Sequence, residues 1–198
     1  MELYMIRHGE SESNAADTHS GWSPVSLTEK GVLQAEAAAR LLRSVRFDQI
    51  FVSDVKRAQQ TADVIFPNRK YIYLPLMREM NNTSMRGKTK EDMEALFGEA
   101  YLSCRRRFDY APLGIDCESG AHFLGRAKEV LDFFARQQGE TIAAVSHAGL
   151  IRACAACVLG TPTHNPPLAC DNASVSVFEL RNGKWRLRAW NLIEDVGY

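Results

Sequence analysis

Short apolar runs alternate with helical segments along most of this chain, and this alternation constrains the fold more than any other feature. The runs predicted to form strands cover residues 2–6, 49–53, 70–74 and 141–146. Apolar residues at helical spacing follow at about residues 28–44, 53–66, 89–108, 123–134 and 149–159. Strands separated by helices pair in parallel, and the helices cover both faces of the sheet. We therefore predict an α/β fold, a three-layer α/β/α sandwich around a central, mostly parallel sheet.

Capping residues indicate where several of these helices begin and end. Thr28 and Ser53 precede helical segments, and their side-chain oxygens predict two N-caps. Thr89 and Asp92 have the spacing of a capping box, and Gly139 is expected to close the fourth helix. The segments left as loops, at residues 11–27, 80–88, 109–120 and 161–172, are free to carry a site.

The C-terminal part follows a different pattern. Residues 174–180 and 185–191 alternate in the manner of strands, and Asn182-Gly183 lies between them. Asn-Gly favours the type I′ turn of a tight hairpin. We predict a C-terminal β-hairpin, and residues 1–198 are interpreted as a single domain.

Charge is balanced over the chain, with 24 Lys and Arg against 24 Asp and Glu. Such a chain has no net field to attract nucleic acid or an anionic membrane, so neither is expected as a partner. No stretch approaches the apolar length that spans a bilayer. The five cysteines are odd in number and scattered, which does not fit a disulfide framework and favours a cytoplasmic protein.

Charged residues stand directly behind two predicted strands. Arg7 and His8 follow the first strand, and His147 follows the strand at residues 141–146. Arg57 lies in an early turn of the helix after the strand at residues 49–53, where backbone N–H groups favour an anion. Open α/β sheets bind ligands at the carboxyl ends of their strands. The pattern indicates a site for a phosphoryl group.

An ordered set of motifs then resembles the histidine phosphatase superfamily, also called the phosphoglycerate mutase-like family, over almost the whole chain. The matching segments are Arg7-His8-Gly9-Glu10-Ser11 with Asn14, Gly21-Trp22, residues 27–31 and 53–62, Arg78-Glu79, Glu118-Ser119, Ser146-His147-Ala148-Gly149 and residues 172–174. A lone Arg-His-Gly triplet would be weak evidence, but this set of blocks at family spacing is a strong signal.

The resemblance implies that His8 is a nucleophile that forms a phosphohistidine. It assigns Arg7, Arg57 and a protonated His147 to the phosphoryl oxygens, and Asn14 adds a donor. Fixed cations replace a metal in that scheme, so neither a metal nor another cofactor is expected. Phosphate or sulfate is expected to bind in the site.

The resemblance also implies a proton donor near the middle of the chain, which corresponds to Glu79. Another branch of the family places its acid directly after the second histidine, where this chain has Ala148. Around the substrate, the expected neighbours are Glu10, Ser11, Trp22 and Ala148, with simple packing as the equal alternative for Trp22. Relatives commonly carry a glutamate before a glycine after the acid, whereas this chain has Arg86 before Gly87. We hypothesise that Arg86 favours a substrate with a second anionic group.

Several of these residues also have ordinary structural explanations. Arg57 could be a solvated helix residue, and Glu79 could form a surface ion pair with a neighbouring arginine. Ser119 is expected to cap the fourth helix rather than touch a ligand. Cys154 and Cys157 have Cys-x-x-Cys spacing, but their alanine-rich helix favours buried apolar positions over a redox or zinc site.

The function predicted on this basis is a metal-independent phosphomonoesterase acting on a small phosphorylated metabolite. The alternatives are a phosphoglycerate mutase-type phosphoryl transfer, an α-ribazole phosphatase-like role, and a phospho-ligand binding module without turnover. Family members are monomers, dimers or tetramers, so the oligomeric state stays open, with a homodimer among the options.

Overall fold

The computed structural model of the protein describes residues 1–194 and contains a six-stranded sheet at its centre. The strands are β1 (Glu2–Arg7), β2 (Gln49–Val52), β3 (Ile72–Tyr73), β4 (Thr141–Ser146), β5 (Val175–Arg181) and β6 (Lys184–Leu192), in the order β3-β2-β4-β1-β5-β6. The first four strands are parallel, while β5 runs antiparallel to β1 and β6 antiparallel to β5. The predicted mostly parallel sheet is confirmed.

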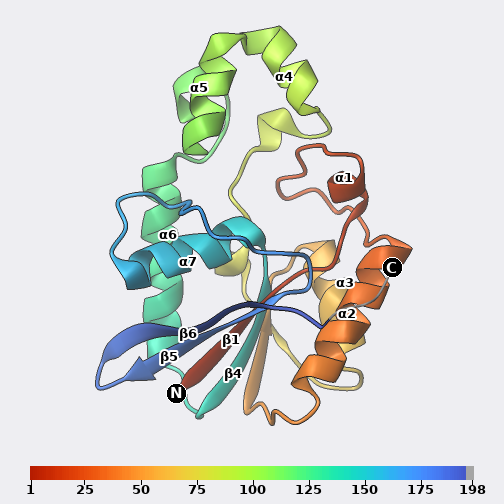
Figure 1. Ribbon diagram of the computed structural model, residues 1–198, viewed down its shortest axis with the longest axis vertical. Coiled ribbons are helices and arrows are strands. Elements are labelled where there is room, and N and C mark those ends of the chain that lie inside the picture. The colour runs from red at the N-terminus through yellow and green to blue at the C-terminus, as the bar shows by residue number, and fades with distance from the viewer. Residues whose placement is uncertain (195–198) are drawn as a thin grey trace.

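Helices cover both faces of this sheet (Figure 1). They are α1 (Glu12–Ala15), α2 (Glu29–Leu42), α3 (Lys56–Ile65), α4 (Lys90–Phe97), α5 (Glu99–Arg107), α6 (Gly120–Ala135) and α7 (Ala148–Leu159), with short 3₁₀ turns at Pro75–Met77, Thr83–Met85 and Ala111–Leu113. One apolar cluster joins the sheet to α6 and α7, and a second joins it to α2 and α3. These two cores confirm the three-layer arrangement.

The alternation of side chains along each strand explains the two cores. On β1, Leu3 and Met5 pack toward α6 and α7, whereas Ile6 packs toward α2 and α3. On β4, Ala144 and Val145 divide between the same two clusters. A strand buried on both faces needs a nearly continuous apolar sequence, and residues 142–145 supply one.

The structure corrects several predicted element bounds. The helix predicted over residues 89–108 is two helices, because Gly98 interrupts it with a φ of 55°. Ser53 does not cap α3, whose N-cap is Val55; the Ser53 hydroxyl bonds His147 instead. The strand predicted at residues 70–74 shortens to two residues in β3. Gly139 lies beyond the end of α6, which closes at Arg136.

Other local predictions are confirmed by the backbone. Thr28 accepts a hydrogen bond from the N–H of Gly31, and Thr89 forms the capping box with Asp92. Ser119 caps α6 by accepting from the N–H of His122. The hairpin turn has positive φ at Asn182 and Gly183, as a type I′ turn requires.

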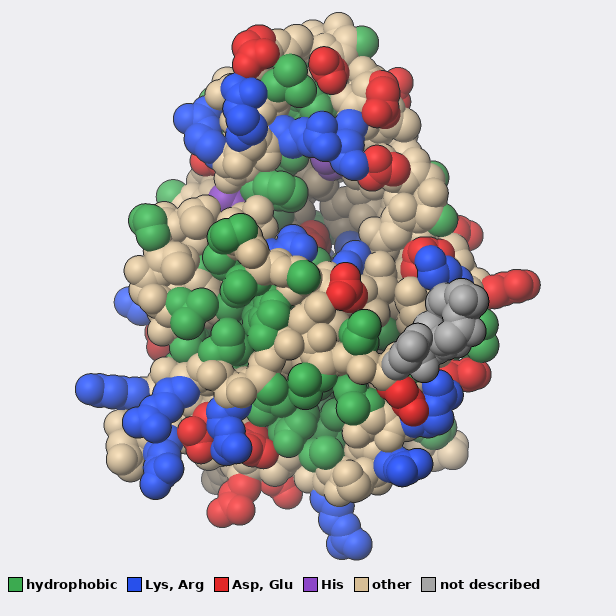
Figure 2. Space-filling model, in the orientation of Figure 1, with side chains coloured by type: hydrophobic (Ala, Val, Ile, Leu, Met, Phe, Trp, Pro, Cys, Tyr) green, Lys and Arg blue, Asp and Glu red, His purple; other side chains and the backbone are tan. Residues whose placement is uncertain are grey.

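Residues 83–113 form a small unit, here called the cap, above the carboxyl ends of the parallel strands (Figure 1). It has its own apolar core, which consists of Met85, Met93, Tyr101, Cys104 and Tyr110. The loop before α2 is tied to the cap, since the N–H of His19 donates to the carbonyl of Lys88. The surface is hollowed between the cap and the three-layer body (Figure 2).

Cys154 and Cys157 lie on α7 where it packs against α6. Their thiols face the carbonyls of Ala127 and Leu124 on that helix. Burial raises the pKa of the Cys154 thiol above its ordinary value, as expected for a packed, unreactive cysteine. The interpretation as small apolar residues therefore fits this position.

No helix within residues 1–194 has the length and apolar character needed to cross a bilayer.

Candidate active site

The two histidines behind β1 and β4 lie side by side. These strands are paired so that Arg7 is opposite Ser146, which brings the next residue of each strand together. The ring centroids of His8 and His147 are 5.2 Å apart. Both rings are buried, with exposed fractions of 4% and 0%. The parallel register thus builds the pair that the sequence predicted.

Arg57 bridges the two rings. Its Nε donates to Nε2 of His8, and its Nη2 donates to Nδ1 of His147, both at 3.1 Å. The carbonyls of Gly21 and Ser23 accept further bonds from its guanidinium at 3.0 and 3.4 Å. Burial lowers the pKa of Arg57 to about 10, and only 1% of the residue is exposed. Arg57 is therefore not the solvated helix residue of the alternative interpretation.

Hydrogen bonds fix the tautomer of each imidazole. Nδ1 of His8 lies 2.7 Å from the carbonyl of Gly9, which can only accept, so the proton is on Nδ1. The lone pair of His8 is then on Nε2, which faces Arg57. In His147 the bond from Arg57 places the lone pair on Nδ1, so Nε2 donates to the hydroxyl of Ser53 at 2.9 Å.

Both imidazoles are held in the neutral form. Burial lowers the pKa of His8 well below its ordinary value, and the charges of Arg57 and Arg7 add to this effect. Burial and Arg57 lower the pKa of His147 in the same way. A protonated His147 was expected from the resemblance, and this geometry differs from that expectation because Nδ1 already accepts from Arg57.

Arg7 approaches the same cluster from β1. Its Nη1 donates to the carbonyl of Cys170 at 2.6 Å, while its buried Nε has no hydrogen-bond partner within the described part of the chain. Burial lowers the pKa of Arg7, and no carboxylate forms a salt bridge with it among residues 1–194. A buried cation with an unused donor is suited to an anionic ligand.

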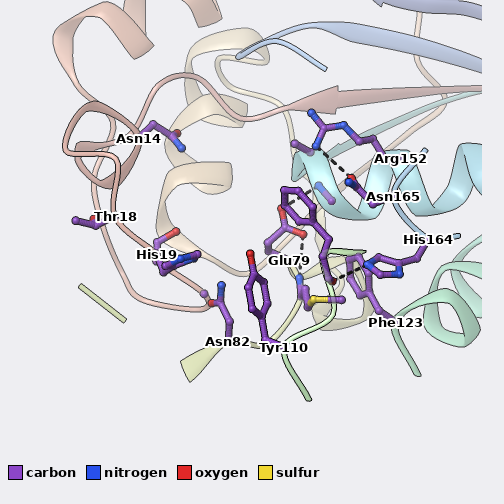
Figure 3. A pocket seen from close by; sticks show the side chains of 16 residues that line it. Asn14, Thr18, His19, Glu79, Asn82, Tyr110, Phe123, Arg152, His164 and Asn165 are labelled. Atoms are coloured by element: carbon purple, nitrogen blue, oxygen red, sulfur yellow. Dashed lines mark hydrogen bonds between the residues drawn. The ribbon is translucent and has the colours of Figure 1, made fainter. Parts of the chain in front are cut away.

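Asn14 is held in place by its own side-chain oxygen. Oδ1 accepts from the hydroxyl and the backbone N–H of Ser11 at 2.9 and 3.1 Å, and from Nδ2 of Asn172 at 3.4 Å. Asn14 lines a cavity that is described below (Figure 3). Because its oxygen already accepts these bonds, its Nδ2 group is the part that can donate to a ligand there. Ser11 is fully buried and orients Asn14 rather than lining the cavity.

Glu79 lies at the floor of this cavity, close to the start of α7. Its Oε2 accepts from the N–H of Gly149 at 3.0 Å, and its Oε1 accepts from the N–H of Met80 at 2.9 Å. Ala148 lines the cavity beside it. The ion pair considered for Glu79 is absent from the described salt bridges, because Arg78 pairs with Asp54 instead.

Arg126 on α6 holds the segment that carries Glu79. Its guanidinium donates to the carbonyls of Leu76, Arg78 and Glu79 at 3.0, 2.7 and 3.1 Å. Glu118 binds the same guanidinium through both oxygens, at 3.0 and 2.7 Å. This role of Arg126 was not predicted from the sequence. Arg126 follows Phe123 by three residues and so lies on the apolar face of α6, where an arginine is expected to bind a buried polar group.

The cavity has a volume of about 250 Å³ and extends from Glu79 up to the cap (Figure 3). Its lining comprises Asn14, Thr18, His19, Ser20, Gly21, Glu79, Met80, Asn82, Phe108, Tyr110, Phe123, Ala148, Gly149, Arg152, His164 and Asn165. Arg152 is in this lining, and its position, like that of Arg126, was not predicted from the sequence. Its Nε donates to the carbonyl of Leu168 at 2.8 Å, which fixes it on the cavity wall.

Three further residues expected around the substrate lie outside this cavity, as Ser11 does. The Nε1 of Trp22 donates to the backbone carbonyl of Glu79 at 2.8 Å, so Trp22 helps to position the Glu79 backbone. Glu10 accepts from the hydroxyl of Thr28 at 3.0 Å and lines a separate depression. Arg86 is exposed on the cap and also lines a different depression. The structure does not bring these three side chains to the cavity wall.

Comparison with known proteins shows the family to which the chain is similar. The family model described as the histidine phosphatase superfamily, branch 1, matches residues 3–193. The chain is 30% identical over 193 residues to the adenosylcobalamin/alpha-ribazole phosphatase of Salmonella typhi, covering 93% of this chain and 88% of the relative. It is also 30% identical over 179 residues to a 2,3-bisphosphoglycerate-dependent phosphoglycerate mutase of Methylobacterium sp. (strain 4-46), covering 83% and 84%.

Among solved structures, the mycobacterial glucosyl-3-phosphoglycerate phosphatase is similar over nearly its whole length. The TM-score is 0.84 at 29% identity, covering 96% of this chain and 98% of that one. The proteins to which this chain is similar thus include both phosphatases and a phosphoglycerate mutase.

Proposed function

This chain belongs to the histidine phosphatase superfamily, and we propose that it is a phosphomonoester hydrolase that works through a phosphohistidine on His8. One observation carries the proposal. The Nδ1–H of His8 is bound to the carbonyl of Gly9, which leaves a lone pair on Nε2 beside the guanidinium of Arg57. A neutral imidazole held in this tautomer is a nucleophile oriented for attack on phosphorus.

In the first step, Nε2 of His8 attacks phosphorus and the bond from phosphorus to the ester oxygen breaks. Arg57, Arg7 and His147 surround the phosphoryl oxygens, whose negative charge spreads in the transition state. The bonds from Arg57 to the two imidazoles are then exchanged for bonds to the phosphoryl group. Phosphate would also favour a proton on His147, since an adjacent dianion raises the pKa of an imidazole.

Glu79 supplies the proton that the leaving alkoxide needs. In the second step the resulting carboxylate accepts a proton from a water molecule, and this water attacks the phosphohistidine. Phosphate leaves, and His8 returns to its neutral form. The bonds from Gly149 and Met80 to the carboxyl group hold Glu79 in the cavity lining, and Gly149 follows His147 by two residues.

A phosphoglycerate mutase-type transfer is the second candidate, and the 30% identity to curated mutases favours it. A mutase passes the phosphoryl group from the histidine to a second hydroxyl instead of water. An α-ribazole phosphatase-like role remains a narrower form of the first candidate, supported by the relative of that name.

A cytoplasmic location stays a prediction from the cysteines of the sequence.

The experiment is hydrolysis of p-nitrophenyl phosphate in the presence of EDTA, by the unmodified protein and by His8→Ala. Hydrolysis that resists chelation and is lost in the variant supports a phosphatase. A second assay offers the unmodified protein phosphoglycerates. Their interconversion without net release of phosphate would favour the mutase. Absence of both reactions would favour a module that binds phosphorylated ligands without turnover.

A further inference from the structure

The cavity is lined in part by rings that no step of the proposed reaction uses. Phe108 directly follows α5 in the cap. Tyr110 also comes from the cap, Phe123 from the first turn of α6, and His164 from the loop after α7 (Figure 3). Phe123 and His164 already meet edge to face, with centroids 5.9 Å apart. Side chains from three separate segments therefore build one aromatic wall.

Phe108 is the ring with the most unoccupied surface in this wall. It is 43% exposed, although it is a large apolar side chain that lines a cavity. Its backbone has a φ of 52° and a ψ of 36°, the left-handed conformation that bulky residues rarely adopt. The Nε2 of His164 lies 2.8 Å from its carbonyl and holds this conformation. Phe108 is the C-cap of α5, and this conformation ends the helix.

Polar groups face the same space. The Tyr110 hydroxyl points into the cavity, and Arg152 and Asn165 lie along the opposite wall (Figure 3). Glu79 is the one carboxylate in the described lining, so the wall does not favour a cationic amine. Polar side chains in the same lining as aromatic rings suit a ligand that is flat and carries polar atoms on its edge.

We propose that this aromatic wall, with Phe108 at its mouth, binds a flat aromatic or heteroaromatic group in the alcohol part of the substrate. The inference rests on the proposed function, because the phosphoryl group must sit at His8 and the ester oxygen near Glu79. Glu79 and Phe108 line one cavity, so the alcohol part of an ester whose oxygen lies near Glu79 extends into the cavity that Phe108 lines. Offset or edge-to-face contact with Phe108 and Tyr110 then holds the ring.

The test compares three primary-alcohol phosphates whose leaving groups are chemically alike: ethyl phosphate, 2-cyclohexylethyl phosphate and 2-phenylethyl phosphate. We expect kcat/KM for the phenyl ester to exceed that for the ethyl ester about tenfold or more, and to exceed that for the cyclohexyl ester as well. Equal values for the ethyl and phenyl esters overturn the proposal. A cyclohexyl ester that equals the phenyl ester also overturns it, because the wall would then be merely apolar.

Variants test whether Phe108 causes the preference for the phenyl ester. Phe108→Leu keeps an apolar side chain without a ring, and it is expected to lower kcat/KM for the phenyl ester about tenfold while leaving that for the ethyl ester unchanged. Phe108→Tyr is expected to retain the preference. Tyr73→Leu removes an exposed ring on β3, outside the cavity, and should change neither value. A preference that survives in Phe108→Leu overturns the role of Phe108.

Binding of non-hydrolysable phosphonates to the unmodified protein separates this inference from the proposed function. Calorimetry with 2-phenylethylphosphonate and ethylphosphonate is expected to show at least about tenfold tighter binding of the phenyl compound. If that preference holds but no ester is hydrolysed, the ring subsite stands and the proposed hydrolase falls. If the esters are hydrolysed and the two phosphonates bind equally, the hydrolase stands and the ring subsite is overturned.

Discussion

Arg57 donates a hydrogen bond of 3.1 Å from its Nε to the Nε2 of His8, the atom that carries the imidazole lone pair. A positive charge at this distance stabilises the neutral form of the ring. It also lies where the phosphoryl oxygens would gather once Nε2 attacks phosphorus. The same guanidinium therefore keeps the nucleophile unprotonated before the reaction and is suited to stabilise charge during it.

Removal of this charge is expected to raise the pKa of His8. In Arg57→Gln the remaining causes are burial and the charge of Arg7, so the pKa moves up toward its ordinary value without reaching it. NMR titration of the imidazole resonances measures the shift. We also expect kcat to fall by about 10²-fold or more, because a donor to the transition state is lost. An unchanged His8 titration would contradict this electrostatic account.

Stability is expected to decrease as the pH falls below about 6.5, the ordinary pKa of histidine. The unfolded chain protonates both imidazoles there, whereas the folded protein keeps them neutral because their pKa values are lowered. The unfolded state thus binds more protons, and acid shifts the equilibrium toward it. Urea unfolding between about pH 7.5 and about pH 5.5, roughly one unit on either side of 6.5, checks this expectation. His147→Asn should reduce the slope; an unchanged slope in that variant would assign it to other groups.

Gly149→Ala is expected to displace the Glu79 carboxyl group. A Cβ at residue 149 would lie 2.2 Å from Oε1 of Glu79, so the carboxyl group must move. We expect kcat to fall at least about tenfold, since proton transfer depends on the position of the acid. Gly125→Ala on α6 is the matched control, because its Cβ meets no atom within 4 Å. Full activity of Gly149→Ala would argue against Glu79 as the proton donor.

Arg126→Lys is expected to lower kcat and leave KM nearly unchanged. Lysine keeps the charge next to Glu118 but cannot donate to three carbonyls and two carboxylate oxygens at once. The segment carrying Glu79 then loses its support, while the residues around the phosphoryl group are untouched. Steady-state kinetics on p-nitrophenyl phosphate measures both constants. Arg106→Lys in an exposed ion pair serves as the control; a rise in KM alone would indicate a direct role in substrate binding.

The sequence predicted the sheet, its faces and the histidine pair because these depend on local patterns. Apolar runs give buried strands, and parallel register brings residues that follow neighbouring strands together. His8 and His147 therefore follow from the order of strands once β1 and β4 are neighbours. The Asn182-Gly183 turn is similarly local, since two positive φ angles suffice to define it.

What the sequence did not predict depends on contacts between distant segments. Arg126 reaches the Glu79 segment across the fold, and Arg86, adjacent to that segment in sequence, lies away from the cavity on the cap. Residue spacing gives no direction for a loop side chain. The break at Gly98 also escaped prediction, because the residues on both sides favour helix and only the backbone shows the turn.

The phosphorylated intermediate itself is the most direct test of this account. The unmodified protein is mixed with p-nitrophenyl phosphate, quenched at early times, and digested under conditions that preserve acid-labile phosphoryl groups, and the peptide containing residues 7–10 is analysed by mass spectrometry. We predict one phosphoryl group on His8 that decays at the rate of turnover. Turnover with no phosphoryl group on His8, or turnover that persists in His8→Ala, would contradict the central claim.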